Sequence, residues 1–411
     1  MLFIYRFLIN FIIILSPIIL VIRFFKKKED PIRFKEKFGF FSKGRRNGKL
    51  VWFHGASVGE LQSIIPLIEK LEKNKSIKQI LITSNTLSSS KVIKNNKFKK
   101  VTHQFFPIDS NYLIKKFLDF WKPKKAFFID SEFWPNTILE LKKRKIPIIL
   151  INGRITKKTF YRWRRFSNIS KKIFRDFDLC LSSSKESYEF LKKLNFPNVK
   201  FIGNLKYSQS ESENLNVNKY LNKFLSSKKS WCASSTHQTE EKFIGQIHKN
   251  LKKRVKNLVT IIIPRHIDRC YDIKKDLEKI GLKVHLDEPS KKIEPNTDIY
   301  LVNSYGKTKI FYNLCKNVFL GGSLIKHGGQ NPLEATRYGC NIIHGPYIQN
   351  FTEIYSFLKR NKISQKVSSQ IKMAKVIEKL INKKPNSKNI QYKLKLIGQK
   401  ILDSTLKEIK I

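Results

Sequence analysis

The sequence FHGASVGELQSIIPLIEKL, residues 53–71, changes its pattern halfway along. It continues an apolar run that begins at residue 51 and holds β-branched and aromatic side chains, which is typical of a strand. After Glu60, apolar residues recur every three or four positions, as in a helix that buries one face. The small residues of segment 55–59 join the two parts. We therefore predict a strand, a tight turn and a helix, with the Glu60 carboxylate at the start of the helix.

The position of Glu60 has two explanations. Loops at the carboxyl ends of parallel strands line the ligand crevice of α/β folds, and helix N-termini favour anions. A functional carboxylate fits this place. An acidic residue that only complements the helix dipole fits it equally well, and the position alone leaves both readings open.

The strand–helix pattern repeats as far as residue 207, and we predict a first α/β domain at 30–207. Further strands are predicted at 79–84, 103–109, 126–136, 146–154, 178–184 and 199–207. This alternation predicts a parallel sheet covered by helices on both faces. Polar residues close several of these strands, and we expect them along one edge of the sheet: Glu60, Asn85, Asp109, Glu132, Asn152 and Arg154. Six such residues on one edge indicate a site.

A second α/β domain is predicted at 230–385, after a polar linker at 208–229 and before a helical tail at 386–411. Ser235 and Thr236 close its first strand, Arg265 closes the next, and a glycine-rich loop follows the strand at 317. Glycines let backbone N–H groups approach a phosphate or a ribose closely. Glu334 lies in the first turn of the helix after this loop. The last strand is expected at 341–354, with the remainder mostly helical.

The N-terminal segment 1–25 is almost wholly apolar, with Arg6 and Asn10 near its start and three lysines, 26–28, after its end. About 20 apolar residues span a bilayer, so the segment is long enough if Arg6 reaches the interface. A cleaved signal peptide is the alternative, but the segment lacks a small-residue cleavage site. We predict a single-pass anchor, with the bulk of the chain cytoplasmic and attracted to anionic lipid.

Length and charge limit the classes of protein to which the chain can belong. The chain has 411 residues, enough for two domains of ordinary size, and 41% hydrophobic residues, which is typical of a globular protein. The formal charge of +50 suggests nucleic acid or an anionic membrane as a partner, or a lysine-rich composition without function. The basic residues are spread along the chain and no zinc-finger spacing occurs, so no nucleic acid is expected. The five cysteines contain no CxxC pair, which indicates a reducing compartment and no metal site.

Eight motifs occur in an order that resembles the lipid A 3-deoxy-D-manno-octulosonic acid (Kdo) transferase family. They are HGASVGE, IDSEFWPN, LINGRIT, GNLKY, STHQTEE, IIPRH, FLGGSLIKHGGQNPLEA and GPYIQNF, and they lie between residues 51 and 354. The resemblance implies a GT-B fold, with two Rossmann-like domains facing a cleft. It also implies inverting transfer of Kdo from CMP-Kdo to the lipid A precursor lipid IVA, at the cytoplasmic face of the inner membrane and without cofactor or metal.

The resemblance assigns roles to individual residues. Glu60 matches the general base and Glu132 the second acidic residue of the acceptor domain. The positions that match CMP-binding residues are Ser235, Thr236, Arg265, Gly306, Gly322, Ser323, Gly329, Asn331 and Glu334. Ser57, Arg154 and Lys206 are candidates for contacts with Kdo or the acceptor.

Three positions depart from the family pattern. Gly55 replaces an alanine, Gln330 replaces a histidine, and Lys307 replaces an acidic residue after Gly306. None removes Glu60. Two alternatives remain from the sequence: a GT-B enzyme that uses another nucleotide sugar at the membrane, and a basic protein that only binds membrane or nucleic acid.

Overall fold

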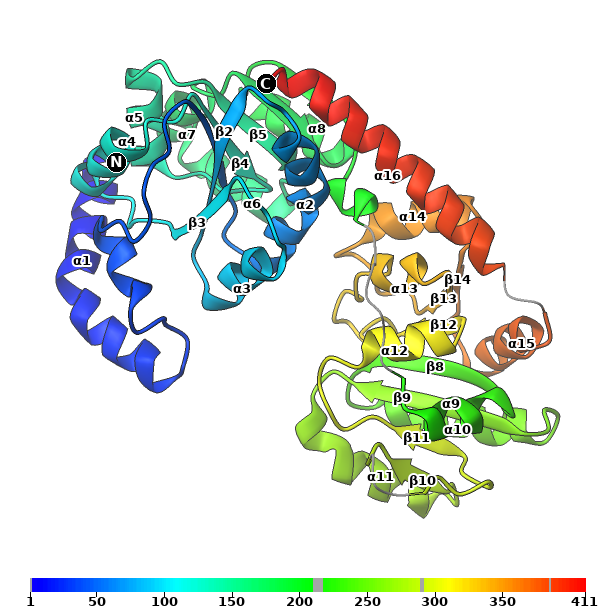
Figure 1. Ribbon diagram of the computed structural model, residues 1–411. Coiled ribbons are helices and arrows are strands. Elements are labelled where there is room, and N and C mark those ends of the chain that lie inside the picture. The colour runs from blue at the N-terminus through cyan, green and yellow to red at the C-terminus, as the bar shows by residue number, and fades with distance from the viewer. Residues whose placement is uncertain (1, 210–216, 289–291, 384–385) are drawn as a thin grey trace. The chain divides into compact units, whose positions relative to one another are not determined.

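Seven parallel strands form the sheet of the first part of the chain, in the order β3-β2-β1-β4-β5-β6-β7. The computed structural model describes residues 2–209, 217–288, 292–383 and 386–411. By its internal contacts the chain forms two units, Met1–Gln209 with Ile397–Ile411, and Ser210–Leu396. Each unit is an α/β layer structure (Figure 1).

In the first unit every described strand is parallel to its neighbours. The strands are β1 Lys49–His54, β2 Ile77–Ser84, β3 Val101–Phe105, β4 Lys125–Ile129, β5 Ile148–Gly153, β6 Leu179–Ser182 and β7 Val199–Phe201. The helices that connect or follow them are α2 Val58–Glu72, α3 Leu87–Asn95, α4 Asn111–Trp121, α5 Pro135–Lys143, α6 Lys157–Arg165, α7 Ser167–Phe174 and α8 Lys185–Lys193. Two 3-10 turns, η1 Arg33–Phe38 and η2 Leu205–Ser208, complete the elements between the termini of this unit.

The order of the strands creates a switch point beside β1. The chain runs from β1 outward to β2 and β3, and then returns to place β4 on the other side of β1. Ligands of open α/β sheets bind at the carboxyl ends of strands where the order reverses in this way. Trp52, Leu81 and Phe128 are fully buried and lie in the core beneath this point.

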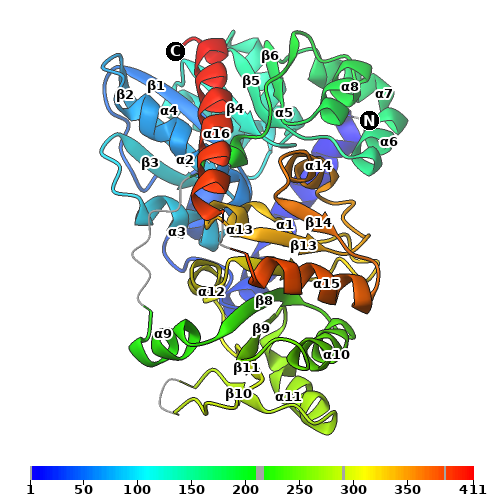
Figure 2. The same cartoon turned by 90° about the vertical axis from the view of Figure 1, so that its right-hand side faces the viewer.

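The second unit repeats the arrangement with the order β10-β11-β9-β8-β12-β13-β14. Its strands are β8 Lys229–Thr236, β9 Leu258–Pro264, β10 Val284–Leu286, β11 Ile299–Leu301, β12 Asn317–Leu320, β13 Asn341–His344 and β14 Ser364–Lys366. Its helices are α9 Lys219–Ser226, α10 Glu240–Lys252, α11 Cys270–Lys279, α12 Thr308–Leu314, α13 Leu333–Arg337, α14 Thr352–Arg360 and α15 Gln370–Ile381, with a 3-10 turn η3 at Ile267–Arg269 (Figure 2). The switch point of this sheet lies between β8 and β12.

Several strand predictions were too long. The strand expected at 103–109 is β3, which ends at Phe105 because Pro107 has no N–H to continue the ladder. The strand expected at 126–136 ends at Ile129, since Asp130 takes a left-handed φ of 57°. The strand expected at 341–354 is β13, which ends at His344, and the three-residue strands β10 and β14 were not predicted.

Both termini belong to the first unit. Helix α1, Leu2–Phe25, lies on this unit, and helix α16, Ser387–Ile409, returns to it from the second. Glu408 forms an ion pair of 2.7 Å with Lys200, and the Ile409 carbonyl accepts from Lys125 Nζ at 2.9 Å. The segment expected as a linker contains α9, and its residues 210–216 lie outside the described part.

Candidate active site

Glu60 occupies the third position of α2, directly after the carboxyl end of β1. Ser57 caps the helix: its Oγ accepts from the Glu60 N–H at 3.3 Å and donates to Glu60 Oε1 at 2.8 Å. The Ala56 N–H donates to Glu60 Oε2 at 2.7 Å. These reciprocal contacts resemble a capping box, with the backbone donor supplied by Ala56, and they hold the carboxylate in one place.

Gly55 allows this close packing. A Cβ added at Gly55 would lie 3.0 Å from Ile129 Cδ1 and 3.3 Å from Glu60 Cβ. The alanine that the family has here would therefore press on the residue that carries the carboxylate. The departure at Gly55 leaves room for the observed position of Glu60.

The surroundings of Glu60 alter its proton affinity. Burial, as the largest cause, and the negative charges of Glu132 and Asp130 together raise the pKa of Glu60 to about 7, while the two hydrogen bonds act in the opposite direction. A carboxyl group with a pKa near the ambient pH is suited to accept a proton during a reaction. The helix-capping role and the chemical role of Glu60 are thus compatible.

Glu132 follows β4, on the other side of the switch point from β2. Its Oε2 accepts from Trp134 Nε1 at 2.8 Å and lies 3.3 Å from Nε2 of the fully buried His54. His54 Nδ1 contacts Thr83 Oγ1 at 2.9 Å, which fixes the ring. Glu132 is therefore oriented by an indole and an imidazole.

Asp130 and Asn152 lie at the same edge of the sheet, and Asp130 is near the two predicted cationic residues, Arg154 and Lys206. Asn152 Nδ2 donates to Asp130 Oδ1 at 2.6 Å, and Lys206 Nζ lies 4.0 Å from Asp130 Oδ2. Arg154 donates its N–H to the Asp130 carbonyl at 3.0 Å, and its charge acts on the Asp130 carboxyl. Burial, as the largest cause, raises the pKa of Asp130. Asp130 was not among the site residues predicted from the sequence. In the structure both Asp130 and Asn152 have left-handed φ values, of 57° and 56°.

Asp109, one of the six strand-end residues, lies in a different environment. It is 1% exposed, and its carboxylate accepts from the N–H groups of Asn136 and Thr137 at 3.0 and 2.9 Å. It therefore caps the first turn of α5.

In the second unit the glycine-rich loop after β12 packs against the start of α10. The Glu240 carboxylate, 1% exposed, accepts from the N–H groups of Gly322 at 2.7 Å, Ser323 at 3.2 Å and Leu324 at 3.0 Å. It also accepts from the His237 N–H at 3.0 Å. The N–H groups that the sequence led us to expect at a phosphate are thus occupied by a carboxylate of the protein itself.

Ser323 is also fully engaged. Its side chain is buried, its Oγ donates to the Leu320 carbonyl, and it accepts from the Gly345 N–H at 2.8 Å. The N–H groups of Gly322 and Ser323 therefore shape the loop, and the predicted contact of these two residues with CMP stays a prediction.

Other predicted positions gather at the same edge of this sheet, because β9, β8 and β12 are adjacent. Ser235 has a left-handed φ of 56°, and the buried Thr236 donates from Oγ1 to Glu241 at 3.0 Å. The exposed Arg265 follows β9 and donates its N–H to the Thr236 carbonyl at 2.9 Å. Gly329 is buried and donates its N–H to the Gly322 carbonyl.

The remaining predicted positions flank this group. Asn331 is exposed, and its Oδ1 accepts from the Leu333 N–H at 3.1 Å at the start of α13. Glu334 lies in the first turn of that helix, and its charge is the second cause, after burial, that raises the pKa of Tyr312. Gly306 is exposed after β11 with φ 85°.

Three histidines, His237, His266 and His327, lie close together beside Arg265, and they were not predicted as a group from the sequence. The ring centroids of His237 and His327 are 4.3 Å apart, and those of His237 and His266 are 6.2 Å apart. Burial, followed by the charges of His327 and His266, lowers the pKa of His237 to about 4. Gln330, one of the departures from the family pattern, places Nε2 3.4 Å from His237 Nε2.

Two α/β units, each with polar residues at its switch point, define a GT-B glycosyltransferase fold. The fold is shared with UDP-GlcNAc 2-epimerase from Neisseria meningitidis, at a TM-score of 0.54 and 14% identity over 87% of this chain and 100% of that one. It is also shared with HepE from Anabaena, solved with UDP and glucose, at a TM-score of 0.55 and 10% identity over 88% and 98% of the two chains.

Similarity in sequence identifies the family more narrowly than the fold does. The profile of the 3-deoxy-D-manno-octulosonic-acid transferase (kdotransferase) family matches residues 32–209. The 3-deoxy-D-manno-octulosonic acid transferase of Rickettsia bellii is 32% identical over 98% of each chain. The one of Haemophilus influenzae is 27% identical over 90% of this chain and 87% of its own. The chain belongs to this family of Kdo transferases and is a glycosyltransferase, which confirms the resemblance seen in its motifs.

Proposed function

We propose that this Kdo transferase uses CMP-Kdo as donor and the lipid A precursor lipid IVA as acceptor, with inversion at the anomeric carbon and Glu60 as general base. The observation that carries the proposal is the Glu60 carboxylate, held by Ser57 and Ala56 with a pKa of about 7. The family relatives support the donor sugar.

The reaction is a single displacement. Glu60 takes the proton of an acceptor hydroxyl while that oxygen bonds to the anomeric carbon of Kdo, and the bond from this carbon to the phosphate oxygen of CMP breaks with its electron pair. CMP leaves as the anion and Glu60 ends protonated. Because the raised pKa keeps Glu60 basic near neutral pH, it accepts this proton better than an ordinary glutamate does.

The neighbours of Glu60 have supporting roles in this proposal. Glu132, oriented by Trp134, holds the acceptor and keeps the proton affinity of Glu60 high. Arg154 and Lys206, which lie beside Asp130, pair with the carboxylate of Kdo, and Ser57 positions the base. Cationic side chains suit this task because the sugar carries its own negative charge.

The donor nucleotide is assigned to the second unit. Arg265 is exposed and offers positive charge to the phosphate, as transferases without a metal require, and the ring nitrogens of the histidines beside it are available as hydrogen-bond partners. Ser235, Thr236, Gly306, Gly329, Asn331 and Glu334 remain the proposed contacts for ribose and base. Gly322 and Ser323 act indirectly, since Glu240 already binds their N–H groups.

We propose that the enzyme works at the cytoplasmic face of the inner membrane, held by α1 and attracted to anionic lipid. The described part contains one helix, Leu2–Phe25, that is long and apolar enough to cross a membrane. A lipid acceptor requires such a location.

The experiment that tests the function is incubation of the purified full chain with lipid A precursor and CMP-Kdo, followed by mass spectrometry of the lipid. We expect CMP release and a mass increase by whole Kdo units. The same incubation with UDP-sugars separates this reaction from that of another GT-B transferase. Transfer from a UDP-sugar and none from CMP-Kdo would refute the proposed donor.

A further inference from the structure

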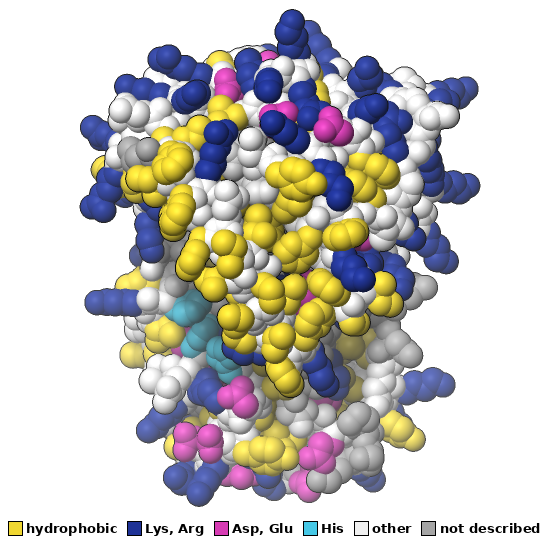
Figure 3. Space-filling view, turned by 90° about the vertical axis from the view of Figure 1, so that its left-hand side faces the viewer, with side chains coloured by type: hydrophobic (Ala, Val, Ile, Leu, Met, Phe, Trp, Pro, Cys, Tyr) yellow, Lys and Arg dark blue, Asp and Glu magenta, His cyan; other side chains and the backbone are white. Residues whose placement is uncertain are grey.

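Helix α1 carries a continuous apolar surface that faces away from the rest of the first unit. Ile4, Phe11 and Ile18, spaced seven residues apart on one side of the helix, are 56%, 49% and 62% exposed. Figure 3 shows hydrophobic side chains gathered across this face of the molecule. Single exposed apolar residues are ordinary, but a patch that runs the length of a helix marks a surface for a partner.

The opposite side of α1 is less exposed than this apolar surface. Residues with reduced exposure recur at the three- and four-residue spacing of a single helix face: Leu2, Tyr5, Ile9, Ile13, Ser16, Leu20 and Phe24. The helix is apolar on both sides, so its outer side needs an apolar environment as well.

The N-terminal end of α1 is hydrogen-bonded to the first unit. Tyr5 OH donates to Asp109 Oδ2 at 2.7 Å, and Arg6 Nε donates to Asn136 Oδ1 at 2.9 Å. Both acceptors are 1% exposed, and Asn136 belongs to the first turn of α5. The start of the helix is therefore tied to the edge of the sheet that carries Glu132.

The C-terminal end of α1 is fixed to the segment that follows it. Arg23 pairs with the buried Glu29 at 2.7 Å, and the rings of Phe24 and Phe34 meet edge to face at 5.4 Å. Lys37 also pairs with Glu29 at 2.7 Å.

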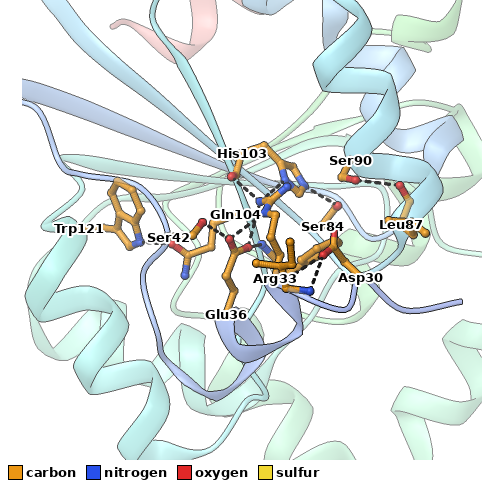
Figure 4. A network of polar contacts seen from close by, with 12 residues as sticks. Asp30, Arg33, Glu36, Ser42, Ser84, Leu87, Ser90, His103, Gln104 and Trp121 are labelled. Atoms are coloured by element: carbon orange, nitrogen blue, oxygen red, sulfur yellow. Dashed lines mark hydrogen bonds and ion pairs between the residues drawn. The ribbon is translucent and has the colours of Figure 1, made fainter. Parts of the chain in front are cut away.

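That segment is in turn fixed to the sheet through the polar network of Figure 4. Arg33 donates to the His103 carbonyl at 2.8 Å and to Glu36, and Ser84 contacts His103 Nε2 at 2.9 Å. Glu36 accepts from the Phe105 N–H at 2.7 Å. Both ends of α1 are thus connected to the first unit.

A bilayer-spanning orientation does not fit these contacts. Tyr5 and Arg23 are 18 residues apart, or about 27 Å along a helix, which is close to the hydrocarbon thickness of about 30 Å. A spanning helix would carry Tyr5 and Arg6 to the far side of the membrane and break their bonds to Asp109 and Asn136.

We infer that α1 lies in the plane of the membrane interface, with its outer apolar face in the lipid and its inner face on the first unit. Such interfacial helices bury their apolar side about 5–10 Å into the headgroup boundary. This inference replaces the single-pass topology that we expected from the sequence.

The charges beside α1 identify the lipid surface as anionic. Lys26, Lys27 and Lys28 are exposed directly after the helix. A pocket of about 750 Å³ is lined by residues from 30–46, after α1, and from 87–103. Among its lining residues are six Lys and Arg side chains and one acidic side chain: Arg33, Lys43, Arg46, Lys91, Lys94, Lys97 and Asp30. Basic residues at a membrane surface contribute about 1 kcal/mol each toward binding anionic lipid.

The orientation has a consequence for the acceptor, which rests on the proposed function. Asn136, which binds Arg6, lies two residues after Trp134, the residue that orients Glu132. A helix fixed in the membrane plane keeps this edge of the sheet at the height of the lipid headgroups. The acceptor sugar then reaches Glu60 while its acyl chains stay in the bilayer.

The test measures the depth of three points on the outer face. Single variants Ile4→Cys, Phe11→Cys and Ile18→Cys of the full chain are labelled with an environment-sensitive fluorophore and bound to vesicles of phosphatidylethanolamine and phosphatidylglycerol. Lipids brominated at different acyl positions then report the depth of each probe. The five native cysteines are buried, so labelling is selective, and Lys26→Cys is the matched control in water.

We expect all three probes to show the same shallow depth and the control to show little quenching. A spanning helix would place the probes at Ile4 and Ile18 about 21 Å apart in depth, with that at Phe11 nearest the centre. That profile would overturn the inference, as would the absence of quenching at all three positions. Because quenching needs no turnover, failure here leaves the proposed Kdo transfer untouched.

Discussion

The two units each place a glutamate in the first turn of the helix after a strand, but the two carboxylates are used differently. Glu60 at the start of α2 is half-buried and receives one backbone N–H and one serine hydroxyl, beside the negative charges of Glu132 and Asp130. Glu240 at the start of α10 is 1% exposed and receives four backbone N–H groups.

The number of donors distinguishes a reactive carboxylate from a structural one. A carboxylate that accepts several backbone hydrogen bonds is stabilised in its charged form, and its oxygens have no free direction. Glu60 accepts only two hydrogen bonds, and its pKa is raised to about 7. Burial raises the pKa of Glu240 as well, but its backbone donors oppose that shift and use the carboxylate to hold the glycine-rich loop in shape.

The largest expected effect is on catalysis, from Glu60→Gln. The amide keeps the size and the contacts to Ser57 and Ala56 but cannot accept the proton of the acceptor. General-base catalysis contributes about 10²- to 10⁴-fold, so Kdo transfer should fall by that factor with little change in stability. CMP release from CMP-Kdo measures it, and Glu69→Gln, on the exposed side of the same helix, is the matched control. Wild-type turnover by a folded Glu60→Gln variant would remove Glu60 from the mechanism.

The corresponding change in the second unit should act on stability. Glu240→Gln leaves one carbonyl oxygen where two carboxylate oxygens accept four N–H groups, which costs about 2–3 kcal/mol for buried donors left without partners. Hydrogen exchange of the Gly322, Ser323 and Leu324 amides should become roughly 30- to 150-fold faster, since 1.4 kcal/mol is tenfold.

Exchange of the β9 amides serves as the internal control for this variant. Unchanged protection at Gly322 to Leu324 would show that Glu240 does not hold the loop. Normal amide exchange together with a loss of Kdo transfer in Glu240→Gln would show that Glu240 takes part in the reaction, as Glu60 does. It would contradict the structural role given to Glu240 here.

A third prediction concerns the pH dependence of transfer. A base works only when ionised, so a Glu60 pKa of about 7 predicts that activity rises with pH through about 7. Glu132→Gln removes the second largest cause of this shift and leaves burial, the largest, in place. The acid limb of the pH–rate profile should then move to lower pH without reaching the ordinary value of 4.5. A limb that stays in place would show that the profile reports another group.

Much of this arrangement was readable in the sequence, and the exceptions have physical causes. The strand–helix alternation and the Ser-Val-Gly-Glu turn predicted both sheets and the position of Glu60, because period and capping chemistry are local. Glu240 lies in a similar local pattern, and only the fold shows that four N–H groups converge on it. Asp130 was missed as a site residue because its side-chain contacts, with Asn152 and Lys206, join residues that are distant in the sequence.

The contacts of α1 show the same limit. Its length and composition predict a membrane anchor, but the hydrogen bonds of Tyr5 and Arg6 join residues more than 100 positions apart and were not predicted. Edge strands of three residues, β10 and β14, carry too few side chains for a pattern. Long-range pairing and short elements are therefore what the sequence alone did not give.

The smallest expected effect comes from Ser57→Ala, which removes the hydroxyl that caps α2 and binds Glu60 Oε1. Loss of an N-cap costs about 1 kcal/mol of stability. Because the Ser57 hydrogen bond lowers the pKa of Glu60, its loss should move the acid limb of the pH–rate profile to higher pH, opposite to the change in Glu132→Gln. Thr239, which precedes α10 without a side-chain cap, offers Thr239→Ala as the matched control with no such shift. Equal profiles for Ser57→Ala and wild type would mean that the Ser57 hydroxyl does not contribute to the proton affinity of Glu60.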